Sequence, residues 1–182
     1  ICVDYTRAFQ FPFTLDKKRV GCFLGSSLGN FNKPNALDFL RQTKKHLGDD
    51  GALLLGVDMK KSKKILDKAY NDSAGTTARF NLNILNHVNK LCAAKFDPSN
   101  FSHLAGYDEG LGCVQMHLVS EFEQKIKVLD TEIEISKGEK IHTEDSYKYS
   151  PSEIESLALK AGFSESASWF DKRGYFGLFY FS

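Results

Sequence analysis

The sequence lacks long hydrophobic runs and any strong excess of charge of one sign. No uninterrupted apolar stretch in its 182 residues approaches the ~20 residues that a membrane-spanning helix needs. Lys and Arg number 24 against 23 Asp and Glu, which leaves a net charge of +1 and argues against nucleic acid or an anionic membrane as a partner. The chain begins in strand-like sequence, and we expect no signal peptide.

The sequence also lacks the residue spacings of metal sites and disulfide frameworks. Its four cysteines lie far apart with no C-x-x-C pair, and its five histidines show neither H-x-x-x-H nor H-E-x-x-H spacing. Cysteines within apolar patterns behave as small hydrophobic residues, which suits a reducing compartment. We therefore expect a cytoplasmic protein without a metal, with enough hydrophobic residues (42%) for one substantial core.

An apolar run that stops at a glycine-serine turn is the most informative local feature. Residues 20–24 predict a strand buried on both faces, and Gly25 and Gly29 then let the backbone turn sharply and approach a ligand. Small molecules bind beyond the carboxyl ends of strands in open α/β sheets, so the turn and Asn30 predict a ligand-binding edge. An ordinary strand-to-helix turn is the alternative, with Asn30 capping the helix that opens near Pro34.

The first third of the chain predicts strands that alternate with helices. Residues 1–3 resemble the end of a strand, a helix with regularly spaced leucines runs from Pro34 to Gly48, and residues 52–58 form a second buried strand. Two strand-helix units in series indicate a doubly wound α/β fold.

The rest of the chain predicts an insertion and a closing hairpin. Residues 62–91 are helical with a break at Gly75, and residues 100–146 alternate with the period of antiparallel strands. A helix capped by Ser150 follows, and a hairpin ends the chain, which places one antiparallel strand among parallel ones. We expect residues 1–61 and 147–182 to form a Rossmann-like domain, and residues 62–146 to form a β-rich and helical insertion that binds substrate.

Several motifs, taken together, resemble one enzyme family. They are residues 23–31 (FLGSSLGNF), 54–58 (LLGVD), 69–72 (AYND), 80–83 (FNLN), 116–120 (MHLVS) and 141–149 (IHTEDSYKY). In this order and spacing the sequence resembles the histidine-specific methyltransferases of ergothioneine biosynthesis, which trimethylate the α-amine of L-histidine to hercynine. The resemblance implies a class I methyltransferase sheet and S-adenosylmethionine as methyl donor.

The resemblance also implies roles for individual residues. Gly25 lies between donor and substrate, Asn30 and Tyr70 hold the α-carboxylate of histidine, Met116 forms a pocket wall, and Glu144 and Ser146 face the imidazole. A carboxylate and a hydroxyl two positions apart point the same way on an extended segment, as an imidazole with two different nitrogens requires. Tyr70 is the candidate to steer a proton.

Each of these residues also has a plainer interpretation. Tyr70 and Met116 fit core positions, and Glu144 and Ser146 fit a solvated turn.

For the donor, the resemblance implies that Asp4 and Tyr5 hold the adenine and that Gly25 and Ser26 line the methyl-donor site. An Asx turn is the plainer interpretation of Asp4. The family's glycine-rich loop and its acidic residue for the ribose would precede residue 1. The sequence therefore predicts the carboxyl-terminal part of a longer protein, with an incomplete sheet and without activity on its own.

The resulting hypothesis is a cytoplasmic, monomeric N-methyltransferase of L-histidine with no nucleic-acid or membrane partner. A related enzyme acting on another amino acid, such as a tryptophan derivative, is one alternative. A non-catalytic fragment that lacks the donor site is the other.

Overall fold

The structure is a computed structural model that describes residues 2–5 and 17–182. The chain divides into two compact units. We call Ile1–Lys60 together with Tyr147–Ser182 the core unit, and Lys61–Ser146 the insertion unit. The assignment of these units as a methyltransferase domain and a substrate-binding insertion stays a prediction.

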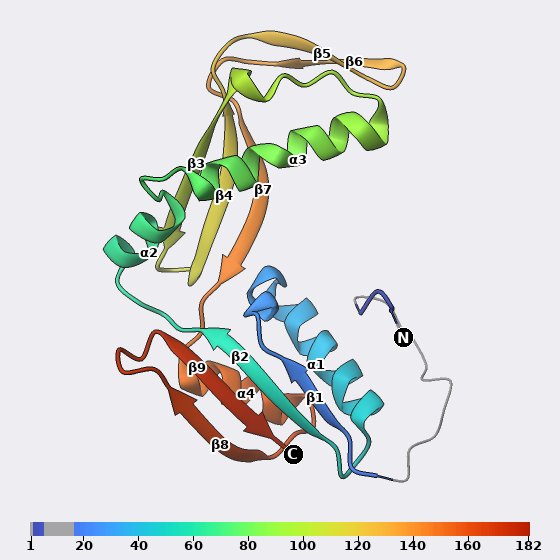
Figure 1. Cartoon of the computed structure of the whole chain (residues 1–182), viewed down its shortest axis with the longest axis vertical. Coiled ribbons are helices and arrows are strands. Elements are labelled where there is room, and N and C mark those ends of the chain that lie inside the picture. Colours follow the sequence, from blue (N-terminus) through green and yellow to red (C-terminus); the bar gives the residue numbers. More distant parts are fainter. Residues whose placement is uncertain (1, 6–16) are drawn as a thin grey trace. The chain divides into compact units, whose positions relative to one another are not determined.

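A four-stranded mixed sheet forms the centre of the core unit (Figure 1). Its strands, in spatial order, are β1 (Val20–Phe23), β2 (Ala52–Asp58), β9 (Phe176–Phe181) and β8 (Glu165–Phe170). β1 and β2 are parallel, whereas β9 runs antiparallel to both β2 and β8. The antiparallel strand expected from the closing hairpin is thus confirmed, and the fold is a Rossmann-like α/β sheet.

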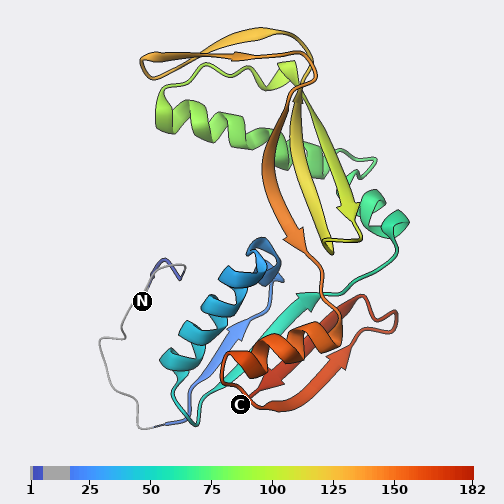
Figure 2. The same ribbon diagram turned by 180° about the vertical axis from the view of Figure 1, so that it is seen from behind.

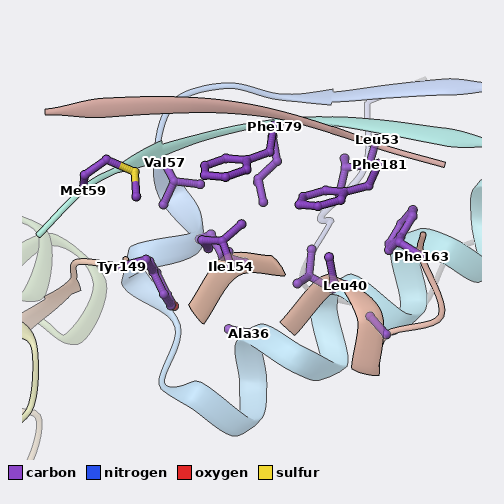
Figure 3. Close-up of a cluster of buried hydrophobic side chains, with 14 residues drawn as sticks. Ala36, Leu40, Leu53, Val57, Met59, Tyr149, Ile154, Phe163, Phe179 and Phe181 are labelled. Atoms are coloured by element: carbon purple, nitrogen blue, oxygen red, sulfur yellow. The ribbon is translucent and has the colours of Figure 1, made fainter. Parts of the chain in front are cut away.

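Two helices, α1 (Lys33–Leu47) and α4 (Pro151–Lys160), cover one face of this sheet (Figure 2). Figure 3 shows Val57, Phe179 and Phe181 pointing from the strands toward Leu40 and Ile154 on the helices, and all five side chains are buried. Phe179 and Phe181 stack with their ring centroids 5.9 Å apart. Apolar burial between sheet and helices therefore holds the core unit together.

Local signals set the ends of both helices, and those of α4 are the ones expected from the sequence. The Asn32 side chain accepts a hydrogen bond from the Asn35 amide and caps α1, and Gly48 follows its last residue. At α4 the Ser150 hydroxyl accepts from the Glu153 amide while the Glu153 carboxylate accepts from the Ser150 amide, which is a complete capping box.

Two expectations about the amino-terminal strands are wrong. β1 is exposed on one face and only partly buried on the other, because Val20 is 53% exposed and Cys22 is exposed, while Phe23 is partly buried against Phe39 of α1. Residues 2–5 form an irregular segment and a turn instead of a strand end, because three apolar residues form a strand only where a neighbouring strand pairs with them. Residue 1 lies outside the described residues.

The insertion unit consists of two helices, a three-stranded sheet and a separate hairpin (Figure 1). Its elements are α2 (Lys63–Tyr70), α3 (Thr76–Cys92), β3 (Phe101–Asp108), β4 (Cys113–Ser120), β5 (Gln124–Val128), β6 (Thr131–Ile135) and β7 (Lys140–Tyr147). The sheet order is β3-β4-β7, and β5 pairs with β6. The helix pair broken near Gly75 and the antiparallel strands after residue 100 are confirmed.

Both helices pack against the same face of the three-stranded sheet. Leu66 of α2 is buried with Val114 and Met116, and Leu85 of α3 is buried with Phe101 and Leu118. Within residues 2–5 and 17–182, no helix has the length and apolar character needed to cross a membrane.

Asp72 holds the turn between α2 and α3. Its two carboxylate oxygens accept hydrogen bonds from the backbone amides of Thr77 (2.8 Å) and Thr76 (2.9 Å), in the first turn of α3. These bonds lower the pKa of Asp72 well below its ordinary value of 3.8, and the bond from the Thr77 amide has the largest effect. The folded state therefore favours the ionised carboxylate.

The expected consequence is a pH-dependent loss of stability. The pKa of Asp72 is lower in the folded chain than in the unfolded one, so its contribution is complete above 3.8 and disappears as the pH falls toward the folded value. Chemical denaturation over this acidic range should show Asp72→Asn less stable than wild type at neutral pH, with the difference shrinking below 3.8. Asp130→Asn, in the exposed β5–β6 turn, is the matched control, and an equal change in both variants would contradict the assignment.

Candidate active site

The turn after β1 is fixed by two contacts within the core unit. Ser26 takes a left-handed backbone conformation (φ 58°), and its hydroxyl oxygen accepts a hydrogen bond of 2.8 Å from the Asp58 amide at the end of β2. Gly29 lies so close to the Tyr147 carbonyl oxygen that an added Cβ would be 2.6 Å from it. Gly25, in contrast, leaves room for a Cβ, whose nearest neighbour would be the Ser27 hydroxyl at 3.5 Å. The absence of a side chain at Gly29 thus allows the backbone to pack against Tyr147, whereas the position of Gly25 has space for a side chain.

Asn30 ends this turn as the last residue of a 3-10 helix, η1 (Ser27–Asn30), and its side chain is exposed. The alternative that Asn30 caps the next helix is wrong, because Asn32 occupies the capping position of α1. The side chain of Asn30 therefore has no capping role, and its assignment to the substrate carboxylate stays a prediction.

Asp4 and Tyr5 lie in the irregular segment before β1, and both are exposed. The Tyr5 ring meets the rings of Phe23 (5.5 Å between centroids) and Phe39 (6.0 Å) edge-on. Aromatic contacts with β1 and α1 thus place Tyr5 beside the first strand of the core unit.

Three of the predicted substrate residues meet in the insertion unit. Tyr70 is the last residue of α2, and its hydroxyl lies 2.8 Å from the hydroxyl of Ser146 on β7. Met116 of β4 is 2% exposed and belongs to the buried cluster against which Tyr70 packs. Glu144 is partly buried two residues before Ser146, a spacing that puts both side chains on one face of β7.

The end of α2 is tied to the edge of β3 by polar side chains. Asp67 accepts a hydrogen bond of 2.8 Å from the Tyr107 amide, and the Asn71 amide group bonds both the carbonyl (3.0 Å) and the amide (3.3 Å) of Ala105. The Lys63 ammonium pairs with the Asp67 carboxylate at 2.8 Å. This bond lowers the pKa of Asp67 most, and the bond from the Tyr107 amide lowers it further. The backbone that carries Tyr70 is therefore anchored on both sides of it.

A buried ion pair lies at the carboxyl end of β2, and we did not predict it from the sequence. The Lys148 ammonium is 3.0 Å from the Asp58 carboxylate, and the Lys148 side chain is 2% exposed. Next to it, the Tyr149 carbonyl accepts from the Lys60 amide, and Tyr149 bridges to Met59. Because the Lys148 side chain is buried while that of Asp58 is 24% exposed, loss of the Asp58 carboxylate would be strongly destabilising. The only signal in the sequence was a lysine between two tyrosines in a motif of the family.

The candidate residues thus fall into two sets. The core unit carries Asp4, Tyr5, Gly25, Ser26 and Asn30, and the insertion unit carries Tyr70, Met116, Glu144 and Ser146. Within residues 2–5 and 17–182, no three His, Cys, Asp or Glu side chains are grouped as metal ligands would be.

The close contact of Gly29 with Tyr147 generates a test. Gly29→Ala should lower the free energy of unfolding by about 1–3 kcal/mol, because the new methyl group meets a backbone carbonyl that has no rotamer to change. Gly25→Ala, four residues earlier, is the matched control and should change stability by less than about 0.5 kcal/mol. Denaturant titration of both variants measures this difference, and a Gly29→Ala protein as stable as wild type would refute the packing argument.

Comparison with known proteins places the chain in a family. The model of the family "Histidine-specific methyltransferase, SAM-dependent" matches residues 1–182. The histidine N-alpha-methyltransferase of Mycolicibacterium smegmatis is 36% identical over 163 residues, which cover 88% of this chain and 51% of that protein. Ergothioneine biosynthesis protein 1 of Neurospora crassa is 31% identical, over 87% of this chain and 18% of that protein.

A relative named for another amino acid also matches. The L-tryptophan methyltransferase trpM of Psilocybe serbica is 28% identical, over 86% of this chain and 44% of that protein. The chain thus spans about half the length of the first of these relatives and less of the other two. Since the family model matches every residue, the chain belongs to the histidine-specific, S-adenosylmethionine-dependent methyltransferases.

Proposed function

We propose that the protein carrying this chain is an S-adenosylmethionine-dependent N-methyltransferase that trimethylates the α-amine of L-histidine to hercynine, as a step of ergothioneine biosynthesis. Family membership over the whole chain supports the reaction class. The observation that carries the proposal on the structural side is the pairing of Tyr70 with Ser146 at 2.8 Å beside buried Met116, because three residues with predicted substrate contacts meet there.

The substrate residues have complementary tasks in this proposal. Asn30 and Tyr70 bind the α-carboxylate of histidine, Met116 packs against the substrate, and Glu144 accepts the ring N–H. A buried carboxylate that pairs with an N–H rejects side chains without one, because the wrong substrate leaves the carboxylate unpaired at about 1–3 kcal/mol. Substrate choice would then rest on Glu144 together with the Ser146 hydroxyl.

The donor residues lie in the core unit, where Asp4, Tyr5 and Gly25 are exposed and Ser26 is partly buried. Asp4 has an exposed carboxylate that suits the adenine amino group, and Gly25 borders open space in which a ligand can approach the backbone. The Ser26 hydroxyl oxygen already accepts from Asp58, so Ser26 would contribute its O–H hydrogen or its backbone. These features fit the donor, which when bound supplies an electrophilic methyl group.

Catalysis in this proposal is positioning. The residues of the chain orient a neutral α-amine and exclude water. The first and the second methylation each give a cationic amine that loses one proton before the next transfer, and the third gives the quaternary ammonium with no proton left to lose. The Tyr70 hydroxyl is the candidate to steer this proton, since the bond to Ser146 fixes its place.

The proposal also covers the partners of the protein and its cellular compartment. We infer a monomeric, cytoplasmic enzyme whose partners are small molecules, with neither nucleic acid nor a membrane among them. The net charge of +1 supports the absence of polyanionic partners.

Calorimetry tests the reaction class and the substrate. L-Histidine and L-tryptophan should be titrated, with and without S-adenosylmethionine, into this chain and into a chain extended at its amino end by its own coding sequence. We expect the extended chain to bind both donor and histidine, and the 182-residue chain to be inactive. Binding of L-tryptophan but not of L-histidine in the presence of the donor would favour the alternative substrate class. A lack of donor binding in both chains would exclude the enzyme.

Glu144 provides the test of the imidazole contact. Glu144→Ala should weaken histidine binding by on the order of tenfold or more, because an N–H of the ring loses a charged acceptor, while donor affinity stays unchanged. Glu132→Ala, in the exposed β5–β6 hairpin, is the matched control. Equal losses of histidine and donor affinity in Glu144→Ala would place Glu144 outside the imidazole pocket.

A further inference from the structure

Two polar side chains of the insertion unit, Asn81 and His103, are connected to the Tyr70 backbone by hydrogen bonds and have no role in the proposed function. Asn81 of α3 is only 3% exposed. Its amide nitrogen lies 3.0 Å from Nδ1 of His103 on β3 and 3.1 Å from the backbone carbonyl oxygen of His117 on β4. The other ring nitrogen of His103, Nε2, lies 2.9 Å from the backbone carbonyl oxygen of Tyr70. These contacts connect α3 through β3 to the last residue of α2.

The two backbone carbonyls determine which atoms of Asn81 and His103 carry the hydrogens of these bonds. A backbone carbonyl only accepts, so the His117 carbonyl requires the nitrogen side of the Asn81 amide to face it. That nitrogen carries two hydrogens, one for His117 and one for Nδ1 of His103, which must then accept. The Tyr70 carbonyl also only accepts, so Nε2 carries the proton of His103. His103 is therefore held as the neutral Nε2–H tautomer.

The consequence for Tyr70 is that it is bound at both ends. Its backbone carbonyl belongs to the last turn of α2, where helix carbonyls have no partner within the helix, and His103 supplies one. Its hydroxyl lies against Ser146. The side-chain bonds of Asp67 and Asn71 to β3 hold the same end of α2, but they start from other residues, whereas the bond from His103 is made to the Tyr70 backbone itself.

We propose that Asn81 and His103 are positioning residues for substrate binding: Asn81 selects the tautomer of His103, and His103 fixes the Tyr70 backbone so that the phenol meets Ser146. This inference rests on the proposed function, because Tyr70 is its substrate-binding residue. Neither Asn81 nor His103 touches substrate, and their effect passes through Tyr70 alone.

Two variants of His103 in the full-length protein separate positioning from packing. A Gln side chain places an N–H donor near the position of Nε2, whereas an Asn side chain places its amide near Nδ1 and cannot reach the Tyr70 carbonyl. His103→Asn should weaken L-histidine binding by on the order of tenfold, and His103→Gln should weaken it by less than about threefold. Affinity for S-adenosylhomocysteine should be unchanged in both. Equal weakening of histidine in the two variants, or a parallel loss of S-adenosylhomocysteine affinity, would overturn the proposal.

The tautomer can be observed without any substrate. In protein labelled with ¹⁵N-histidine, the signals that disappear in His103→Gln identify His103, and long-range ¹H–¹⁵N spectra at neutral pH should show a protonated Nε2 and a bare Nδ1. A protonated Nδ1 would overturn the inference even if both variants fold poorly. Failure of the wild-type protein to bind histidine would contradict the proposed function instead, and the tautomer would still decide the role of Asn81.

Discussion

The free edge of β3 is the constraint on which the candidate substrate site depends. β3 pairs with β4 along one edge, and the backbone groups of its other edge need partners as well. Helix α2 supplies them through side chains, with Asn71 bonding Ala105 twice and Asp67 accepting from Tyr107. Each bond contributes about 1 kcal/mol, so together they fix the helix along the strand. The position of Tyr70 thus follows from side-chain bonds between α2 and the backbone of β3.

The core unit fixes its turn by a different means. At Gly29 two backbone segments touch, and no side chain fits between them. Ser26 adds a hydroxyl bond to the end of β2, where Asp58 also pairs with buried Lys148. Polar side chains thus position the residues of the insertion unit, whereas the turn of the core unit combines close backbone packing at Gly29 with the Ser26 bond. In both units part of this support comes from residues that are not expected to bind ligand, Asp67 and Asn71 in one and Asp58 and Tyr147 in the other.

The same contrast explains how much the sequence could predict. The capping box of Ser150, the break at Gly75 and the alternating strands depend on residues close in the chain, and their patterns predicted them correctly. The burial of β1 depends on which elements flank it, and the pair of Asp58 with Lys148 joins residues far apart in the sequence. Neither has a local pattern. The family motifs singled out Tyr70, Met116 and Ser146, whereas their contacts required coordinates.

Under the proposed function, the ring nitrogens of the substrate distinguish an imidazole from an indole at this site. Glu144 lies on the same face of β7 as Ser146 and supplies a carboxylate acceptor. Both rings carry one N–H for that carboxylate, whereas only the imidazole has a second, bare nitrogen that requires a donor. A relative that acts on a tryptophan derivative therefore needs no donor for a second ring nitrogen, while the anchoring of α2 to β3 would serve either substrate.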